Sequence, residues 1–313
     1  MQTVPLQDAI RTGGSASSLS VAAGRNDRLV GLACVVFTAL GWGLNWPATK
    51  MLLTTCPPLS ARGLSGLAAG GILFGVAASL GESLTVPRRL WGRLVIASLL
   101  NVSVWMGLTT ASLLWLPAGQ AATLAYTMPV WTALLAWPIL NERPSPRQIG
   151  AIALGIIGVV ILVGGTNFQL DAARIPGVAL ALSASVLFAL GTVLSKQMPI
   201  ALPRVALTAW QVTLGCVPLL GAGLLFEQAH FDGLPLIGWL ALAYTAFVSM
   251  GICYLLWFAA VRRLKASSAA IGTLLTPVIG VAASAIALGD PMTLSQVVSL
   301  GLVVAGIILV IRD

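Results

Sequence analysis

Residues 116–162 read LPAGQAATLAYTMPVWTALLAWPILNERPSPRQIGAIALGIIGVVIL, and residues 264–310 read LKASSAAIGTLLTPVIGVAASAIALGDPMTLSQVVSLGLVVAGIILV. A shift of 148 positions aligns these stretches without a gap, so that Pro129 falls on Pro277. The same register extends back to residue 91, and both halves are strongly apolar. Two hydrophobic halves built from one unit are typical of many membrane carriers, whose substrate site lies between the repeats.

The composition predicts an all-α integral membrane protein. The chain is 58% hydrophobic and 8% charged, whereas a soluble domain carries roughly 25% charged residues. The apolar stretches have the length of membrane-spanning helices and lack the alternation of barrel strands. Ten spans are predicted, at approximately 30–53, 60–80, 91–111, 116–139, 147–164, 175–196, 204–226, 235–260, 266–288 and 293–311.

The ends and loops of the chain predict its domain organisation. Residues 1–27 are polar and contain no apolar run of secretory length, so we expect a disordered cytoplasmic tail. The remainder divides into a first five-helix repeat, 28–164, and a second one, 165–313. The four cysteines show no metal-ligand spacing, so we expect neither a metal site nor a disulfide framework.

Loop charges predict the orientation in the bilayer. Fourteen of the 17 Lys and Arg residues fall on the side of the N-terminal tail, and only Lys50, Arg62 and Arg174 fall on the other side. The positive-inside rule therefore places both termini in the cytoplasm. Because each repeat has five helices, an odd number, the second must be inverted relative to the first. An inverted five-plus-five repeat allows one site to face either side of the membrane in turn.

Polar and aromatic residues in the middle of the helices are the candidate substrate-binding residues. Trp42 and Asn45 share one helix face, with Trp46 adjacent, and such residues are costly to expose to lipid. The alternative is that the indoles pack and the amides bond a neighbouring helix. The full candidate set is Trp42, Asn45, Trp46, Ser98, Asn101, Trp105, Thr123, Tyr126 and Tyr254.

Pro129 and Pro277 are the candidate hinge residues. A proline inside a helix removes one backbone hydrogen bond and usually bends the helix. Paired breaks at equivalent positions of two halves indicate the moving elements of a carrier. A static kink is the alternative, since membrane helices tolerate prolines.

The residues that are missing narrow the chemistry. No acidic residue lies in the middle of a predicted helix, although a carrier of cationic drugs needs a buried carboxylate. Sugar phosphates need a basic cluster, but Lys50, Arg62 and Lys196 all lie near a predicted boundary. A zwitterion or a neutral amphiphile fits these residues better than a cationic drug or a sugar phosphate does. The net charge of +8 is explained by the loops, so no nucleic-acid partner is expected.

Enzyme chemistry is not predicted. The sequence has no GxxxxGK[ST] loop for ATP, its only histidine is His230 in a loop, and no cofactor is implied. A membrane-embedded enzyme would need buried acids or histidines. A channel is the other alternative, but it gives no reason for an inverted repeat with paired prolines. The residues leave open the energy source and the choice between monomer and homodimer.

The chain resembles the drug/metabolite transporter superfamily, and within it the EamA-type ten-helix carriers. The resemblance is carried by ALGWGLNWPATK at residues 39–50, by Arg62, and by the two repeat stretches 116–162 and 264–310. It covers about residues 28–311, and the overall pattern also resembles bacterial aromatic amino acid exporters. It implies a secondary transporter that exports amino acids, with large neutral or aromatic ones preferred, across the bacterial inner membrane, and export of another small metabolite or a drug is the alternative.

Overall fold

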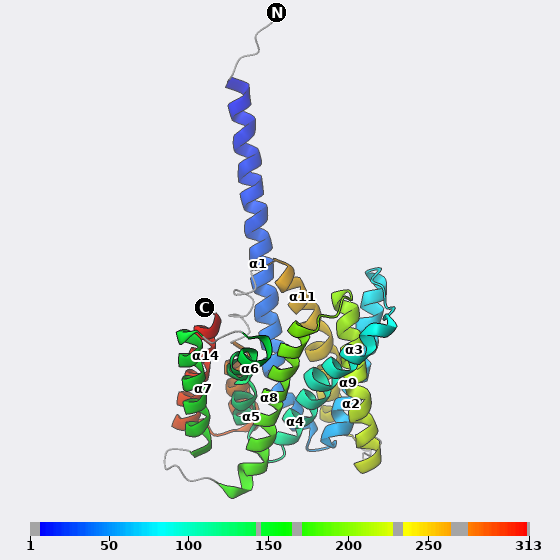
Figure 1. Ribbon diagram of the computed structural model, residues 1–313, viewed down its shortest axis with the longest axis vertical. Coiled ribbons are helices and arrows are strands. Elements are labelled where there is room, and N and C mark those ends of the chain that lie inside the picture. The colour runs from blue at the N-terminus through cyan, green and yellow to red at the C-terminus, as the bar shows by residue number, and fades with distance from the viewer. Residues whose placement is uncertain (1–6, 142–144, 165–170, 228–233, 264–274, 312–313) are drawn as a thin grey trace, which may run out of the picture.

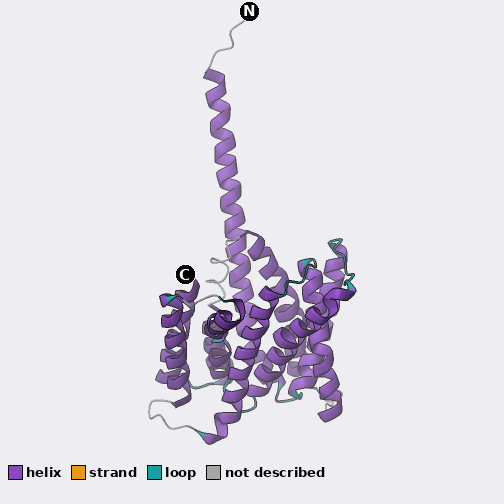
Figure 2. Cartoon of the chain, viewed as in Figure 1, coloured by secondary structure: helices purple, strands orange, loops and turns teal. Residues whose placement is uncertain are grey.

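The computed structural model describes residues 7–141, 145–164, 171–227, 234–263 and 275–311, and within these ranges the regular structure is entirely helical (Figure 2). The all-α prediction is therefore confirmed. Long apolar helices are favoured in a bilayer because they satisfy their backbone hydrogen bonds internally. The helices of the first half are α1 (Gln7–Leu52), α2 (Pro58–Ser79), η1 (Arg88–Leu90), α3 (Trp91–Ser98), η2 (Leu99–Val104), α4 (Trp105–Ser112), α5 (Ala118–Ala125), α6 (Met128–Leu140) and α7 (Pro146–Gly164).

The second half continues with the same kinds of element. Its helices are η3 (Ala172–Arg174), α8 (Ile175–Gln197), α9 (Arg204–Phe226), α10 (Leu236–Ala243), η4 (Tyr244–Ile252), α11 (Cys253–Arg263), α13 (Leu275–Leu288) and α14 (Leu294–Ile311). Two sets of consecutive elements follow one another without a break. In the first half, α3, η2 and α4 form one long irregular helix, and in the second half, α10, η4 and α11 form another.

Within the described ranges, seven helices are long and apolar enough to cross a membrane, so the chain is a multi-pass membrane protein. They are Asp27–Leu52, Pro58–Ser79, Arg88–Ser112, Ala118–Leu140, Ala172–Gln197, Arg204–Phe226 and Leu236–Trp257. Three shorter apolar helices lie at Ile152–Leu162, Leu275–Leu288 and Leu294–Gly306. The count of ten spans is not reached by length and composition alone, and residues 264–274, at the start of the ninth predicted span, lie outside the described ranges.

Helix α1 differs from the predicted N-terminal tail. The sequence predicts a disordered tail over residues 1–27, whereas the structure continues α1 back to Gln7 as a rod that stands away from the bundle (Figure 1). The apolar, membrane-crossing part of this helix begins at Asp27. The boundary between tail and first repeat therefore stays a prediction.

The outside of the bundle is apolar. Leu225, Phe226 and Ile286 expose 79%, 83% and 86% of their surface. Side chains of this size and exposure are placed in lipid at little cost, whereas in water a continuous apolar surface promotes association.

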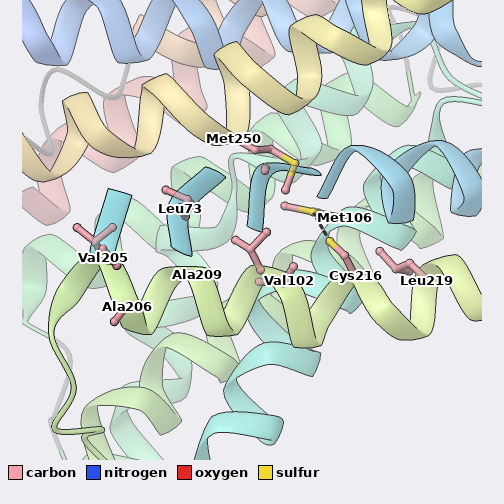
Figure 3. Close-up of a cluster of buried hydrophobic side chains, with 12 residues drawn as sticks. Leu73, Val102, Met106, Val205, Ala206, Ala209, Cys216, Leu219 and Met250 are labelled. Atoms are coloured by element: carbon pink, nitrogen blue, oxygen red, sulfur yellow. Dashed lines mark hydrogen bonds between the residues drawn. The ribbon is translucent and has the colours of Figure 1, made fainter. Parts of the chain in front are cut away.

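Helices α2 and α9 pack against each other along an antiparallel seam of small residues. A Cβ added to Gly63 would lie 2.5 Å from the Leu220 backbone, and one added to Gly223 would lie 2.7 Å from the Ser60 nitrogen. At the middle of the seam, the Cys216 thiol lies 3.9 Å from the Met106 sulfur, with Met250 beside them (Figure 3). Glycine allows the two backbones to approach closely, as is common between membrane helices.

The long irregular helices depart from α-helical geometry at two places, and three described loops have a left-handed residue, Gly81, Asn141 or Gly289. Leu99–Val104 and Tyr244–Ile252 are π-helical, a geometry often found at functional sites. Asn141 and Gly289 both have positive φ, of 56° and 68°, and each ends the helix before it. The two π-helical segments contribute Asn101, Ser249 and Met250 to the wall of the cavity described next.

Candidate functional site

A cavity of about 470 Å³ lies inside the bundle, between α1, α2, the two irregular helices, α8 and the junction of α5 with α6. This volume is typical of sites for small molecules. The described residues that line it are Trp42, Asn45, Trp46, Arg62, Asn101, Trp105, Met106, Thr109, Leu113, Tyr126, Met128, Pro129, Phe188, Ser249, Met250, Tyr254 and Trp257. Seven of the nine predicted substrate-binding residues are among them.

One face of α1 forms the first wall. Trp42 donates from its indole nitrogen to the carbonyl oxygen of Ser249, at 3.0 Å. That carbonyl lies in the π-helical segment, whose altered hydrogen bonding leaves backbone groups available to side chains. The Asn45 side-chain oxygen accepts a hydrogen bond from Thr245 at 3.3 Å, and Trp46 is buried at 7% exposure. The indole of Trp42 is thus oriented by the opposing helix.

Aromatic rings from three elements meet around this face. The ring of Trp42 lies 5.6 Å from that of Tyr254, edge to face, and 6.0 Å from that of Trp257. The ring of Trp46 lies 6.4 Å from that of Tyr126. Such separations are the favourable range for aromatic pairs. The rings give the cavity a broad apolar surface with restricted freedom to rearrange.

The π-helical segment Leu99–Val104 brings an amide to the opposite wall. Asn101 donates from its amide nitrogen to the Ser195 hydroxyl at 3.3 Å, while its side-chain oxygen is buried without a partner among the described residues. Next along the chain, the ring of Trp105 lies 4.8 Å from that of Phe188. Two of the three predicted residues on this irregular helix, Asn101 and Trp105, therefore lie in the cavity wall.

The two predicted hinge prolines differ in their surroundings. Tyr126 and Thr127 lie between α5 and α6, and Pro129 follows as the second residue of α6 and lines the cavity. The break is fixed by a contact of 3.0 Å between the hydroxyls of Thr127 and Ser185. Pro277 is buried as the third residue of α13 and is not part of the cavity wall. A hinge role for either proline stays a prediction.

Two predicted residues do not reach the cavity. Ser98 and Thr123 are each 1% exposed, and neither is among the lining residues. The Ser98 hydroxyl donates to the Leu94 carbonyl at 2.7 Å, and the Thr123 hydroxyl donates to the Gly119 carbonyl at 2.9 Å. Both hydroxyls therefore bond within their own helices, as small polar residues often do in membranes.

Arg62 is the lining residue that the sequence analysis places elsewhere. The sequence puts it at a span boundary, but in the structure it is the fifth residue of α2, 8% exposed, with its side chain in the cavity wall. Its Nε donates to the Thr110 hydroxyl at 2.6 Å and one Nη donates to the Thr49 hydroxyl at 3.1 Å. The sequence signal was a charged residue a full turn inside a helix, next to the small residue Gly63.

The lining residues determine what the cavity can do. Among those described, none is acidic and none is histidine, and the searched residues contain no group of three ligands that could hold a metal ion. One cation, two amides, several hydroxyls and seven aromatic rings face a mainly apolar space. This set can bind a small amphiphile, and it supplies no acid–base pair for catalysis.

Comparisons with a family model and with individual proteins agree on the family. The model of the EamA-like transporter family matches residues 29–164 and again residues 175–312. An uncharacterized transporter, YvbV, of Bacillus subtilis (strain 168) is 34% identical over 282 residues, which cover 88% of this chain and 90% of that protein. The "Probable amino-acid metabolite efflux pump" of Salmonella typhimurium is 31% identical, covering 90% of this chain and 94% of that protein.

A solved crystal structure is similar in fold. It is 20% identical, with a TM-score of 0.62, covering 91% of this chain and 96% of that one. Members of the family that matches both halves are membrane transporters and not enzymes. On the double match of the family model and the relatives of matching length, this chain belongs to the EamA-like transporter family, part of the drug/metabolite transporter superfamily.

Proposed function

We propose that this protein is a secondary transporter that exports amino acids, with large neutral and aromatic ones preferred, across the bacterial inner membrane by alternating access. The observation that carries the proposal is the cavity of about 470 Å³, lined by aromatic rings and amides and by no acidic residue among those described. Indoles supply apolar contact with loose geometry, so selectivity among side chains is modest. Asn45 and Asn101 bind polar groups of either sign.

The names of two relatives support the same substrate class. The relatives from Salmonella typhimurium and Escherichia coli are both named amino-acid metabolite efflux pumps, and the second is 27% identical over 299 residues. Another small metabolite or a drug is the alternative substrate. The missing acidic residue argues against a cationic drug, because a buried ammonium group is normally met by a carboxylate.

An inverted repeat is one symmetry that allows alternating access, and the backbone supports one. Two of the three left-handed residues, Asn141 and Gly289, are 148 positions apart, which is the shift found in the sequence. The π-helical segment Leu99–Val104 shifts onto 247–252, inside the second π-helical segment Tyr244–Ile252. Backbone irregularities at equivalent positions are expected when two halves have one fold.

Helix packing follows the same symmetry. Helix α1 packs on α13 and α11, and α8 packs on α6 and α4, which are their equivalents in the other half. Helices α2 and α9 pair with each other, as do α7 and α14. We therefore propose ten membrane helices in two inverted five-helix units, 28–164 and 165–313, following the tail 1–27.

Two acidic residues lie at opposite ends of the α2–α9 seam, and each caps the start of one of its helices. Glu227, which follows α9, accepts hydrogen bonds from the backbone nitrogens of Leu59 and Ser60 at the start of α2, at 3.0 and 2.8 Å. Glu82, which follows α2, accepts one from the Ala206 nitrogen at the start of α9, at 2.8 Å. Each helix thus ends near an acid that caps the other, although Glu82 shifts onto position 230, three residues beyond Glu227.

The proposed orientation places both termini in the cytoplasm, because 14 of the 17 Lys and Arg residues lie on that side. Reporter fusions after residues 86, 143 and 264 should read cytoplasmic, and fusions after 56, 170 and 230 should read periplasmic. A reversed pattern would contradict the orientation.

Counterflow in liposomes containing the purified protein tests the function. We expect phenylalanine or tryptophan to be exchanged, and Trp42→Ala or Trp105→Ala to reduce that exchange by about fivefold or more, with a smaller effect on threonine. Trp239→Ala is the matched control, because Trp239 is 46% exposed on the outside of the bundle. Flux of a sugar phosphate or quaternary ammonium, with no amino acid flux, would overturn the substrate class.

A further inference from the structure

Arg62 is a buried cation without an acidic partner. It is 8% exposed and lines the cavity, at a depth where an uncompensated charge is costly. The ion pairs found among the described residues are Arg174 with Asp171 and Arg263 with Asp27, both at exposed positions. Since the described lining contains no carboxylate, Arg62 gives the cavity a net positive charge.

Two hydroxyl groups orient the guanidinium without neutralising it. Thr110, 0% exposed, accepts from Nε at 2.6 Å, and Thr49, 2% exposed, accepts from Nη2 at 3.1 Å. These contacts use two of the five N–H groups of Arg62. Nη1 and the second hydrogen of Nη2 have no protein acceptor within the described ranges, so the end of the guanidinium fork remains available. That fork matches the two oxygens of a carboxylate.

We propose that Arg62 binds the carboxylate of the transported substrate, and that the carboxylate, not the ammonium, is the group that this protein recognises. The inference rests on the proposed function and deepens it. The substrate class then becomes amphiphilic carboxylates with an apolar or aromatic end. Amino acids belong to this class, and so do N-acyl amino acids and arylalkanoic acids that carry no ammonium at all.

The geometry along α1 gives the substrate a direction. Thr49, which holds Arg62, lies seven residues after Trp42, which corresponds to about 10 Å along the helix axis. Trp46 lies between them on the cavity wall. A carboxylate at Arg62 therefore places an attached ring one to two helical turns away, toward the aromatic contacts of Trp42. An indole or phenyl group three or four bonds from a carboxylate spans part of this distance.

A ligand series on the unaltered protein provides the first test. Binding of L-tryptophan, tryptophanamide, N-acetyltryptophan and indole-3-propionate would be measured by stabilisation of the purified full-length chain in detergent. We expect the three carboxylates to bind within about fivefold of one another, and tryptophanamide to bind about tenfold or more weakly. The inference is overturned if tryptophanamide binds as tightly as tryptophan.

Substitution of the arginine provides the second test. Arg62→Gln is expected to weaken binding of indole-3-propionate about tenfold or more and to leave tryptophanamide unchanged, a selective loss that general damage to the fold does not produce. Arg62→Lys keeps the charge but not the fork, so an intermediate loss is expected. Arg174→Gln removes the same charge at an exposed position and should change neither ligand. Unaltered binding of the acid to folded Arg62→Gln protein would overturn the inference.

The two proposals fail in different ways. Binding of indole-3-propionate that depends on Arg62, without amino acid counterflow, would refute amino acid export and retain the carboxylate site. Amino acid counterflow with equal binding of tryptophanamide would retain the function and refute the role of Arg62. Because the ligand series needs no variant, a failure of Arg62→Gln to fold leaves the first test decisive.

Discussion

The two halves of the chain share their backbone irregularities and differ in the side chains that face the cavity. Two of the three left-handed residues, Asn141 and Gly289, coincide after the shift of 148 positions. By contrast, Arg62 coincides with Trp210, which donates to the Leu84 carbonyl and lies away from the cavity. The difference indicates that the two halves share these backbone features without sharing the residues that face the cavity, so that the cation of the described lining belongs to the first half.

A methyl group at the seam is expected to have the largest effect on the shared scaffold. Gly63→Ala would place a Cβ 2.5 Å from the backbone of Leu220, which cannot move aside as a flexible side chain would. Overpacking of this kind costs about 1–3 kcal/mol, and a backbone contact favours the upper end. Thermal unfolding of the purified protein measures the loss.

Gly71→Ala is the matched control for this prediction. Gly71 lies on the same helix, and a Cβ added there meets nothing within 4 Å. Because alanine is favoured over glycine in a helix by about 1 kcal/mol, this variant should be neutral or slightly more stable. Equal behaviour of the two variants would contradict the close α2–α9 seam.

The two capping acids test how symmetrical the seam is. Glu227 also accepts from the Ser60 hydroxyl, at 2.7 Å, so it makes three hydrogen bonds where Glu82 makes one. Hydrogen bonds to charged groups and charges at helix N-termini stabilise by a few kcal/mol at most. We expect Glu227→Ala to lower the free energy of unfolding by about 2 kcal/mol and Glu82→Ala by about 1 kcal/mol.

Asp27→Ala is the control for the capping acids, since Asp27 pairs with Arg263 at the surface and exposed pairs contribute little. Equal losses from Glu82→Ala and Glu227→Ala would mean that the hydrogen-bond count does not govern stability here. A larger loss from Glu82→Ala would reverse the comparison between the two ends.

The paired prolines test whether the shared backbone moves. Pro129→Ala and Pro277→Ala should lower the maximal transport rate severalfold and change KM little, because they alter bending and not the wall that binds substrate. Pro218→Ala, inside α9, is the control, since the equivalent residue of the first half is Gly70. A double variant that transports at the normal rate would show both kinks to be static.

Much of this fold was predictable because membrane-spanning segments can be recognised from their apolar composition. The span predicted at 204–226 coincides with α9, and the seven candidates found in the structure all fall on predicted spans. The tail differs, since the structure continues α1 back to Gln7. Apolar runs indicate the length of a membrane span, but they do not indicate where a polar helix begins.

The candidate site was less predictable, for a physical reason. Helical spacing selected Trp42, Asn45 and Asn101, which line the cavity, because indoles and amides in mid-membrane turn toward a cavity. Spacing did not separate them from Ser98, whose hydroxyl bonds to its own helix. It also placed Arg62 at a boundary, since a long side chain reaches well beyond its own backbone position.

The smallest predicted effect is on the labelling rate of Cys56, a residue at the end of the α2–α9 seam where Glu227 lies. This thiol lies between α1 and α2 and is 3% exposed. Burial, with a smaller contribution from the Glu227 carboxylate, raises the pKa of Cys56 to about 11. A raised thiol pKa favours the neutral form, and the thiolate is the reactive species. Maleimide labelling should therefore be slow at pH 8 and should accelerate as the pH rises toward 11.

Labelling of Cys56 also discriminates between the two ends of the seam. With the other three cysteines replaced by alanine, Glu227→Ala should speed labelling at pH 8, because it removes both the neighbouring negative charge and the cap on α2. Glu82→Ala acts at the opposite end and should leave the rate unchanged. Folding stability linked to this thiol is present below its unfolded pKa and is lost as the pH rises through the folded value. If Glu82→Ala accelerates labelling equally, the seam opens as a whole, and the two ends are not independent.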